Sequence, residues 1–105
     1  MKIAIASTSK KEGGEISQRG GRAPFYLVYD GEGSLLETIK NPVEQGGGGV
    51  GSFVAKMLAD KKVTMFMAEK IGPNMIQALD QYGIEYKEMS GNIGEALKQL
   101  ITKSI

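Results

Sequence analysis

The chain has 105 residues, of which 41% are hydrophobic and 24% charged, and its formal net charge is +1. This length and composition predict one globular domain over residues 1–105. The balance of 13 basic and 12 acidic residues gives no reason to expect nucleic acid or an anionic membrane as a partner. Cysteine and histidine are absent, which excludes disulfides and the usual zinc sites. The amino-terminal apolar run is too short for a signal peptide or a membrane span, so we expect a cytoplasmic protein.

The first half of the chain predicts a buried strand followed by an antiparallel hairpin. Lys2–Ser7 is a β-branched and alanine run typical of a buried strand. Ser9–Arg22 is polar and contains several glycines, which indicates a long loop. Phe25–Asp30 and Leu35–Lys40 are expected to be strands, and the Asp30–Gly33 turn joins them into a hairpin.

The middle of the chain predicts a helix followed by a central strand. We expect a helix from about Val50 to Lys61. Its apolar residues repeat at helical spacing and are Val50, Phe53, Val54, Met57 and Leu58. Val63–Ala68 is short and almost wholly apolar, which suits a parallel strand that is covered on both faces.

The last third predicts two more helices separated by an edge strand. Pro73 is placed as the first residue of a helix, and Gly83 as its carboxyl-terminal cap. Ile84–Met89 has mixed polarity, as expected at a sheet edge, and Asn92 is a capping residue for the final helix. Because helical crossovers join parallel strands, the chain predicts a mixed α/β sheet with helices on both faces and the first strand near the centre.

The glycine run Gly46–Ser52 opens the first helix. Its match to the dinucleotide fingerprint carries little weight, because four consecutive glycines fit many patterns, and the lysine of a phosphate loop is missing after Gly51. One interpretation is a flexible connector. The other is an anion site, formed by free N–H groups at the helix N-terminus. We expect Gly46–Gly51 and Lys10–Gly21 to be the most mobile segments, because neither contains an apolar anchor.

Three segments are expected to meet at the carboxyl edge of the sheet, where open α/β sheets bind ligands. They are the arginine-containing loop after the first strand, the glycine run, and the start of the second helix. Taken alone, the arginines fit an ordinary solvated loop. Together with two helix N-termini, their guanidinium groups favour an anionic ligand. The predicted binding residues are Arg19, Gly21, Arg22, Gly47, Gly48, Gly49, Gly51, Ser52, Gly72 and Asn74.

Catalysis is not expected from these residues. The first strand contains no acidic residue, and the aspartates at positions 30, 60 and 80 fall at turns and helix surfaces, so a carboxylate cluster for metal-dependent chemistry is not predicted. The absence of histidine and cysteine excludes the common catalytic triads. The six methionines are interpreted as core-filling residues rather than as a soft-metal site.

The order of these signals resembles the dinitrogenase iron–molybdenum cofactor biosynthesis family of small NifX-like domains, which also resemble the carboxyl-terminal part of NifB. The resemblance rests on GGRAPFYLVYD at Gly20–Asp30, the glycine run, and IGPN at Ile71–Asn74, and it covers nearly the whole chain. It implies a ribonuclease-H-like three-layer fold with five strands in the order 3-2-1-4-5 and an antiparallel second strand. It also implies a non-enzymatic accessory protein of nitrogen fixation, which carries an iron–sulfur or iron–molybdenum-type cluster transiently and passes it to a cofactor-assembly protein.

The chain departs from the family pattern beside the Gly-Arg-Ala turn. Many relatives have histidine and then phenylalanine there, and this chain has Arg19 and Gly20. Without imidazole or thiolate ligands, a cluster is expected to arrive complete and to be held by charge and hydrogen bonds. The alternative is an interaction module, or a module that binds phosphate, a nucleotide or another small anion, on the same fold but without cluster binding.

Overall fold

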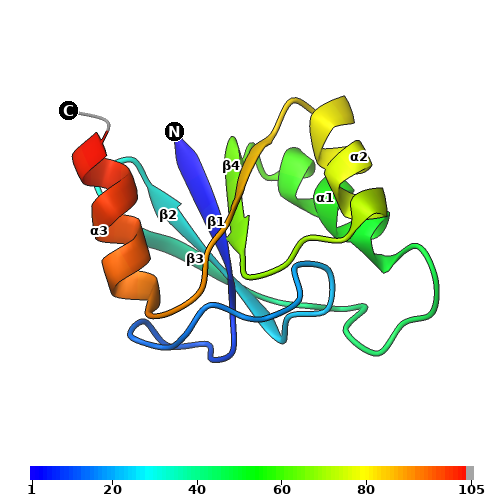
Figure 1. Cartoon of the computed structure of the whole chain (residues 1–105), viewed down its shortest axis with the longest axis horizontal. Helices are drawn as coiled ribbons and strands as arrows, with labels where there is room; N and C mark the ends of the chain where they lie inside the picture. The colour runs from blue at the N-terminus through cyan, green and yellow to red at the C-terminus, as the bar shows by residue number, and fades with distance from the viewer. Residues whose placement is uncertain (104–105) are drawn as a thin grey trace.

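A five-stranded sheet in the order β3-β2-β1-β4-β5 forms the centre of the structure (Figure 1). The computed structural model describes residues 1–103. The elements are β1 (Lys2–Ser7), β2 (Phe25–Asp30), β3 (Leu35–Lys40), α1 (Val50–Asp60), β4 (Met65–Ala68), α2 (Pro73–Gln81), β5 (Glu85–Glu88) and α3 (Ile93–Lys103). β2 is antiparallel to both β1 and β3, whereas β1, β4 and β5 are mutually parallel. The predicted sheet order and the central position of the first strand are therefore confirmed, and the arrangement is compatible with a ribonuclease-H-like fold.

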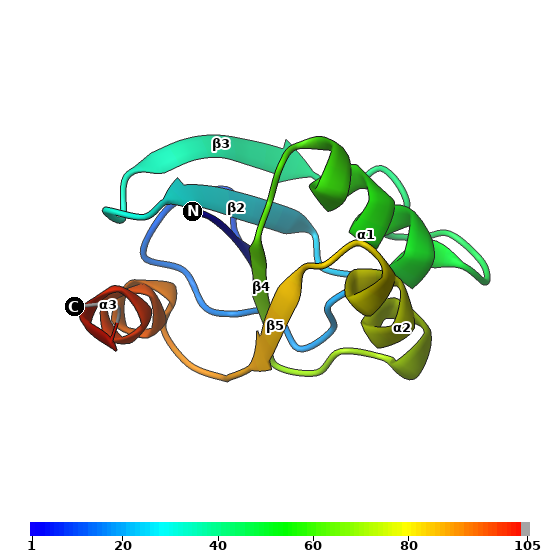
Figure 2. The same ribbon diagram turned by 90° about the horizontal axis from the view of Figure 1, so that it is seen from above.

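Helices cover both faces of the sheet, as predicted (Figure 2). α1 and α2 lie side by side on one face, and α3 lies on the other. Because successive side chains of a strand point to opposite faces, Ala4 and Phe66 pack beneath α1 and α2, whereas Ile5 and Met67 pack beneath α3. All four are fully buried. The sheet is thus the middle layer of three.

The ends of the helices follow the sequence signals. Pro73 occupies the first turn of α2, and Gly83 follows that helix with a φ of 72°, which favours glycine. The Oδ1 of Asn92 accepts the N–H of the third residue of α3 at 3.1 Å. β4 and β5 begin later than predicted, because Val63 and Ile84 still donate their N–H groups to the last turns of α1 and α2. None of the described helices is long and apolar enough to cross a membrane.

The buried face of α1 differs from the predicted one. Phe53 is 48% exposed, although its spacing places it with the apolar residues. The fully buried residues of this helix are Val54, Ala55 and Leu58. Small residues at Gly51 and Ala55 let α1 approach its neighbours closely, so the helix turns this side inward and leaves the phenylalanine outside. Hydrophobic spacing alone does not report such a close approach.

The loop after β1 is anchored, contrary to prediction. Its residues 15–20 form a strap across the carboxyl ends of β1 and β4 (Figure 1). Ile16 is 3% exposed and belongs to the core beneath α3. The N–H of Lys70 donates to the carbonyl of Gln18 at 2.9 Å. The expectation that Lys10–Gly21 lacks an apolar anchor is therefore wrong, because one isoleucine in a polar stretch leaves no periodic signal.

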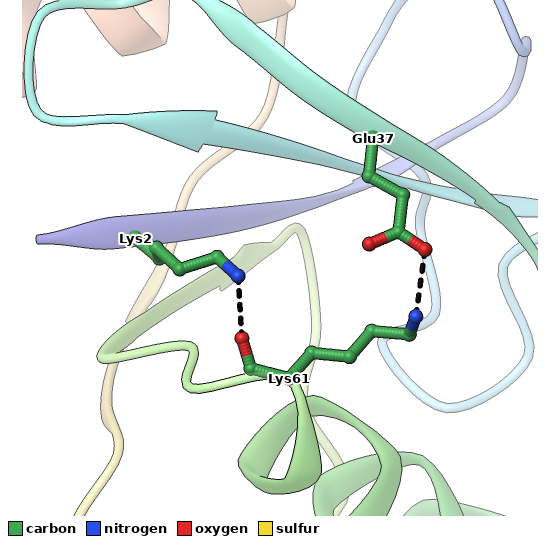
Figure 3. Close-up of polar contacts among 3 residues, drawn as sticks. All are labelled: Lys2, Glu37 and Lys61. Atoms are coloured by element: carbon green, nitrogen blue, oxygen red, sulfur yellow. Dashed lines mark hydrogen bonds and ion pairs between the residues drawn. The ribbon is translucent and has the colours of Figure 1, made fainter.

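A small polar cluster lies at the C-terminus of α1 (Figure 3). The Nζ of Lys2 donates to the carbonyl of Lys61, the capping residue of α1, at 2.6 Å. The Nζ of Lys61 in turn pairs with Glu37 on β3 at 2.6 Å. A cation at a helix carboxyl terminus interacts favourably with the helix dipole. This contact ties the C-terminus of α1 to the start of β1, so the N-terminus of the helix lies towards the carboxyl edge of the sheet.

Candidate functional site

A cavity of about 440 Å³ lies at the carboxyl edge of the sheet. The strap and the turn after it form one wall, the start of α1 forms a second, and the start of α2 forms a third. The lining residues are Arg19, Gly20, Gly21, Arg22, Gly47, Gly48, Gly49, Val50, Gly51, Lys70, Gly72, Pro73, Asn74 and Met75. The three segments that the sequence places at this edge thus do lie around one cavity.

All of the predicted binding residues except Ser52 line this cavity. Ser52 is exposed in the first turn of α1 and is not among the lining residues. The glycines at positions 47, 48, 49 and 72 have open space where a side chain would begin, so they leave room beside the backbone. The structure places these residues together, and their role in binding stays a prediction.

Five lining residues are absent from the predicted binding set, namely Gly20, Val50, Lys70, Pro73 and Met75. Lys70 is exposed and follows β4, and the strap pairs with its backbone. Its position just after a predicted buried strand was a signal that it lies at the carboxyl edge of the sheet. Met75 is 2% exposed and fills the core, as expected of the methionines, but it also lines the cavity from α2. The cavity therefore has a third cationic side chain and an apolar floor.

The cationic side chains of the cavity differ in their partners. Within the described residues, the side chains of Arg19 and Lys70 take part in neither a hydrogen bond nor an ion pair. Arg22 instead donates from Nη1 to the carbonyl of Gly46 at 2.7 Å and from Nη2 to that of Gly47 at 3.1 Å. Two positive charges are thus open to a ligand, and a third holds the backbone beside it.

Two helix N-termini face this cavity. The capping residues of α1 and α2 are Gly49 and Gly72, and neither helix has a hydrogen bond from a side chain to its first turn. The first N–H groups of an α-helix have no partner within the helix, and the helix dipole makes this end positive. Both features add to the positive charge of the lining side chains, so the cavity favours an anion.

A buried polar network fixes the turn that carries Arg22. The hydroxyl of Tyr26 donates to the carbonyl of Gly20 at 2.5 Å. Burial raises the pKa of Tyr26 well above its ordinary value, so the hydroxyl stays protonated and keeps this donor. The Nδ2 of Asn41 donates to the carbonyls of Gly21 and Ala23 at 3.1 and 2.9 Å. Carbonyl groups on both sides of Arg22 are thus held by one buried amide.

Close backbone contacts bring the three walls together. A Cβ at Gly51 would lie 2.8 Å from the Cβ of Met75 and 3.3 Å from its Cα. A Cβ at Gly21 would lie 3.2 Å from the Cα of Gly51. The 2.8 Å contact is shorter than a side chain tolerates, and the 3.2 Å contact would require Gly51 to give by a few tenths of an ångström. Glycine at these two positions therefore lets the turn, α1 and α2 meet closely.

Gly51→Ala is therefore expected to lower the free energy of unfolding. Forcing an extra methyl group into a packed site costs about 1–3 kcal/mol, and the better helix propensity of alanine offsets about 1 kcal/mol of that. Gly48→Ala is the matched control, because its side chain meets open space and its φ is not positive. Denaturant midpoints measure both variants. Equal stabilities would contradict the assigned contact.

Metal ligation by side chains has little support in this cavity. Among residues 1–103, no group of three or more aspartates, glutamates, cysteines or histidines lies close enough to hold a metal ion. The sulfur of Met75 is a soft donor, but thioethers alone are poor ligands for iron in clusters. The lining can offer positive charge, backbone N–H groups and apolar contact.

The fold and the site define a small α/β domain with a basic, glycine-lined cavity at the carboxyl edge of an open sheet. A family model described as dinitrogenase iron-molybdenum cofactor matches residues 1–103, and the chain belongs to this family.

The chain is also similar to individual proteins over most of its length. The chain is 29% identical to the uncharacterized protein MJ0580 of Methanocaldococcus jannaschii, over 93% of this chain and 83% of that protein. It is similar to a Thermotoga protein with a provisional NifB assignment, at 28% identity and a TM-score of 0.79, over 94% of this chain and 85% of the other. The apo form of the orange protein from Desulfovibrio gigas has the same fold, with 24% identity and a TM-score of 0.90, over 97% and 88% of the two chains.

Proposed function

We propose that the protein is a non-enzymatic carrier in the cytoplasm. It holds an anionic iron–sulfur or iron–molybdenum-type cluster, or a precursor of one, and presents it to a cofactor-assembly protein. The family supports a role in cofactor biosynthesis. The observation that carries the proposal is the meeting of Arg19, Arg22 and Lys70 with two uncapped helix N-termini around one cavity.

The lining supports retention without ligation. A cluster with thiolate or sulfide at its corners has a negative charge and accepts hydrogen bonds, which the exposed cations and the backbone N–H groups supply. Met75 adds an apolar surface to the lining, and electrostatic attraction is stronger beside apolar groups than in bulk water. A preassembled cluster fits this arrangement better than one built on the protein.

The same donors also suit a phosphate group, which gives a second candidate function. Helix N-termini and arginine side chains are common phosphate-binding groups. The observation that favours this candidate is the absence of histidine and cysteine, the residues that would distinguish a cluster site from a phosphate site. A phosphate- or nucleotide-binding module is therefore the alternative that the test has to separate.

Anaerobic titration separates the two candidates. The wild-type protein is titrated with isolated iron–molybdenum cofactor and, separately, with ATP, and binding is followed by absorbance and calorimetry. A further sample receives only iron and sulfide. We expect saturable binding of the complete cofactor and little cluster formation from iron and sulfide. Binding of ATP with none of the cofactor would overturn the proposal and favour the second candidate.

A further inference from the structure

We infer that Arg22 is a positioning residue that holds the backbone of the glycines before α1 beside the cavity, and that Arg19 and Lys70 are the side chains that meet the ligand. This inference rests on the proposed function and assigns separate tasks to the three cations of that site. The Arg22 guanidinium group donates three hydrogen bonds to backbone carbonyls. Arg22 donates to the carbonyls of Gly46 and Gly47, and more weakly to that of Glu44 at 3.4 Å.

The glycine loop, defined as Gly46–Gly49, has few other restraints. At Gly47, Gly48 and Gly49 no atom lies within 4 Å of the position that a Cβ would take, so neighbouring side chains do not pack against them. Glycine loses more conformational freedom on ordering than any other residue. The ends of the loop are held by the N–H of Gly46, which donates to Val43, and by the carbonyl of Gly49, which accepts from Phe53. Between them the unpacked glycines depend on Arg22, which bonds the carbonyls of the first two residues.

The other end of this connection is rigid. The backbone of Arg22 lies between two carbonyls that Asn41 holds, and Asn41 is only 4% exposed. Asn41 also donates to the hydroxyl of Tyr26 at 3.2 Å, and that ring packs against Phe66 with centroids 6.0 Å apart. The guanidinium group of Arg22 thus links a turn that is held by the core to a loop with few other restraints.

The planar guanidinium group suits this task, and an ammonium group does not. Arginine presents several N–H donors in a fixed fork and can serve adjacent carbonyls together, whereas lysine is a compact charge on a flexible stem. Arg22→Lys therefore keeps the positive charge and loses the fork. This substitution separates a role in positioning from a role in attraction.

The first measurement uses the ligand-free protein. Backbone NMR order parameters are compared for wild type, Arg22→Lys, Arg22→Ala and the matched control Arg19→Ala, whose side chain bonds to nothing in the described structure. We expect lower order parameters at residues 46–49 in both Arg22 variants and wild-type values there in the control. Wild-type order parameters in the Arg22 variants would overturn the inference, whether or not a ligand binds.

The second measurement is titration with isolated iron–molybdenum cofactor at two salt concentrations. Arg22→Lys is expected to weaken binding about tenfold or more, the order that bonds to a charged group contribute, and to keep the wild-type dependence on salt. Arg19→Ala is expected to weaken binding and to reduce that dependence, because it removes an ionic contact. Wild-type affinity in Arg22→Lys would overturn the inference. Failure of the cofactor to bind wild type would instead overturn the proposed function, and the order parameters would still decide the role of Arg22.

Discussion

Replacing Arg19 and Arg22 together by alanine is expected to weaken binding of an anionic cluster by roughly 100-fold or more. A hydrogen bond to a charged group contributes about 1.5–3 kcal/mol, and about 1.4 kcal/mol corresponds to a tenfold change in affinity. The first substitution removes a charge open to the ligand, and the second removes the bonds that hold the glycine loop. Anaerobic titration of wild type and the double variant measures the difference.

Two controls make this result specific. Added salt should weaken wild-type binding more than it weakens binding to the double variant, because the attraction is ionic and partly exposed. The denaturant midpoint should change little, because the side chain of Arg19 is exposed and the hydrogen bonds of Arg22 go to carbonyls of a loop. Equal binding to both proteins would show that the cavity is not the site.

Phe66→Ala is expected to lower the free energy of unfolding by about 3–5 kcal/mol, the range for removing a buried aromatic ring. Phe66 lies on β4, is fully buried, and packs against Tyr26 with an interplanar angle of 51°. Its ring also lies beneath the strap, since a Cβ at Gly20 would be 3.1 Å from its Cε2. Loss of the ring leaves a cavity between the sheet, α2 and the strap.

Two other substitutions calibrate this loss. Val54→Ala in α1 should cost less, near or below 2 kcal/mol, because fewer atoms leave a buried position. Met89→Ala should cost least, because this residue is half-buried next to the edge strand β5. Denaturant midpoints give the order. Equal small losses for all three would contradict the assignment of β4 as the centre of the core.

Sequence reasoning succeeded where the signal is local. The hairpin turn, Pro73, Gly83 and Asn92 each depend on the backbone of a few neighbouring residues, and the structure confirms them. The sequence also predicted that three segments meet at the carboxyl edge, because the direction of a strand fixes the edge of the sheet at which the next loop lies.

The features that sequence reasoning missed depend on contacts between segments that are distant in the chain. The exposure of Phe53 follows from how closely α1 approaches its neighbours, which no spacing within the helix reveals. The strap is held by Ile16 and by pairing with the backbone of Lys70, and both contacts need the folded sheet. The hydrogen bonds of Arg22 to the glycine loop span 24 and 25 residues, so its position beside that loop was not visible in the chain.

The glycines of the run are not equivalent, and this makes the site open to redesign. Gly51 is fixed by its contact with Met75, and Gly49 by a φ of 84°. Gly47 and Gly48 have neither restraint: space is open around them and their φ angles are not positive. These two positions can accept a cysteine or a histidine without strain. An engineered thiolate or imidazole there would give the cavity a side chain that can coordinate metal, which its present lining lacks apart from Met75.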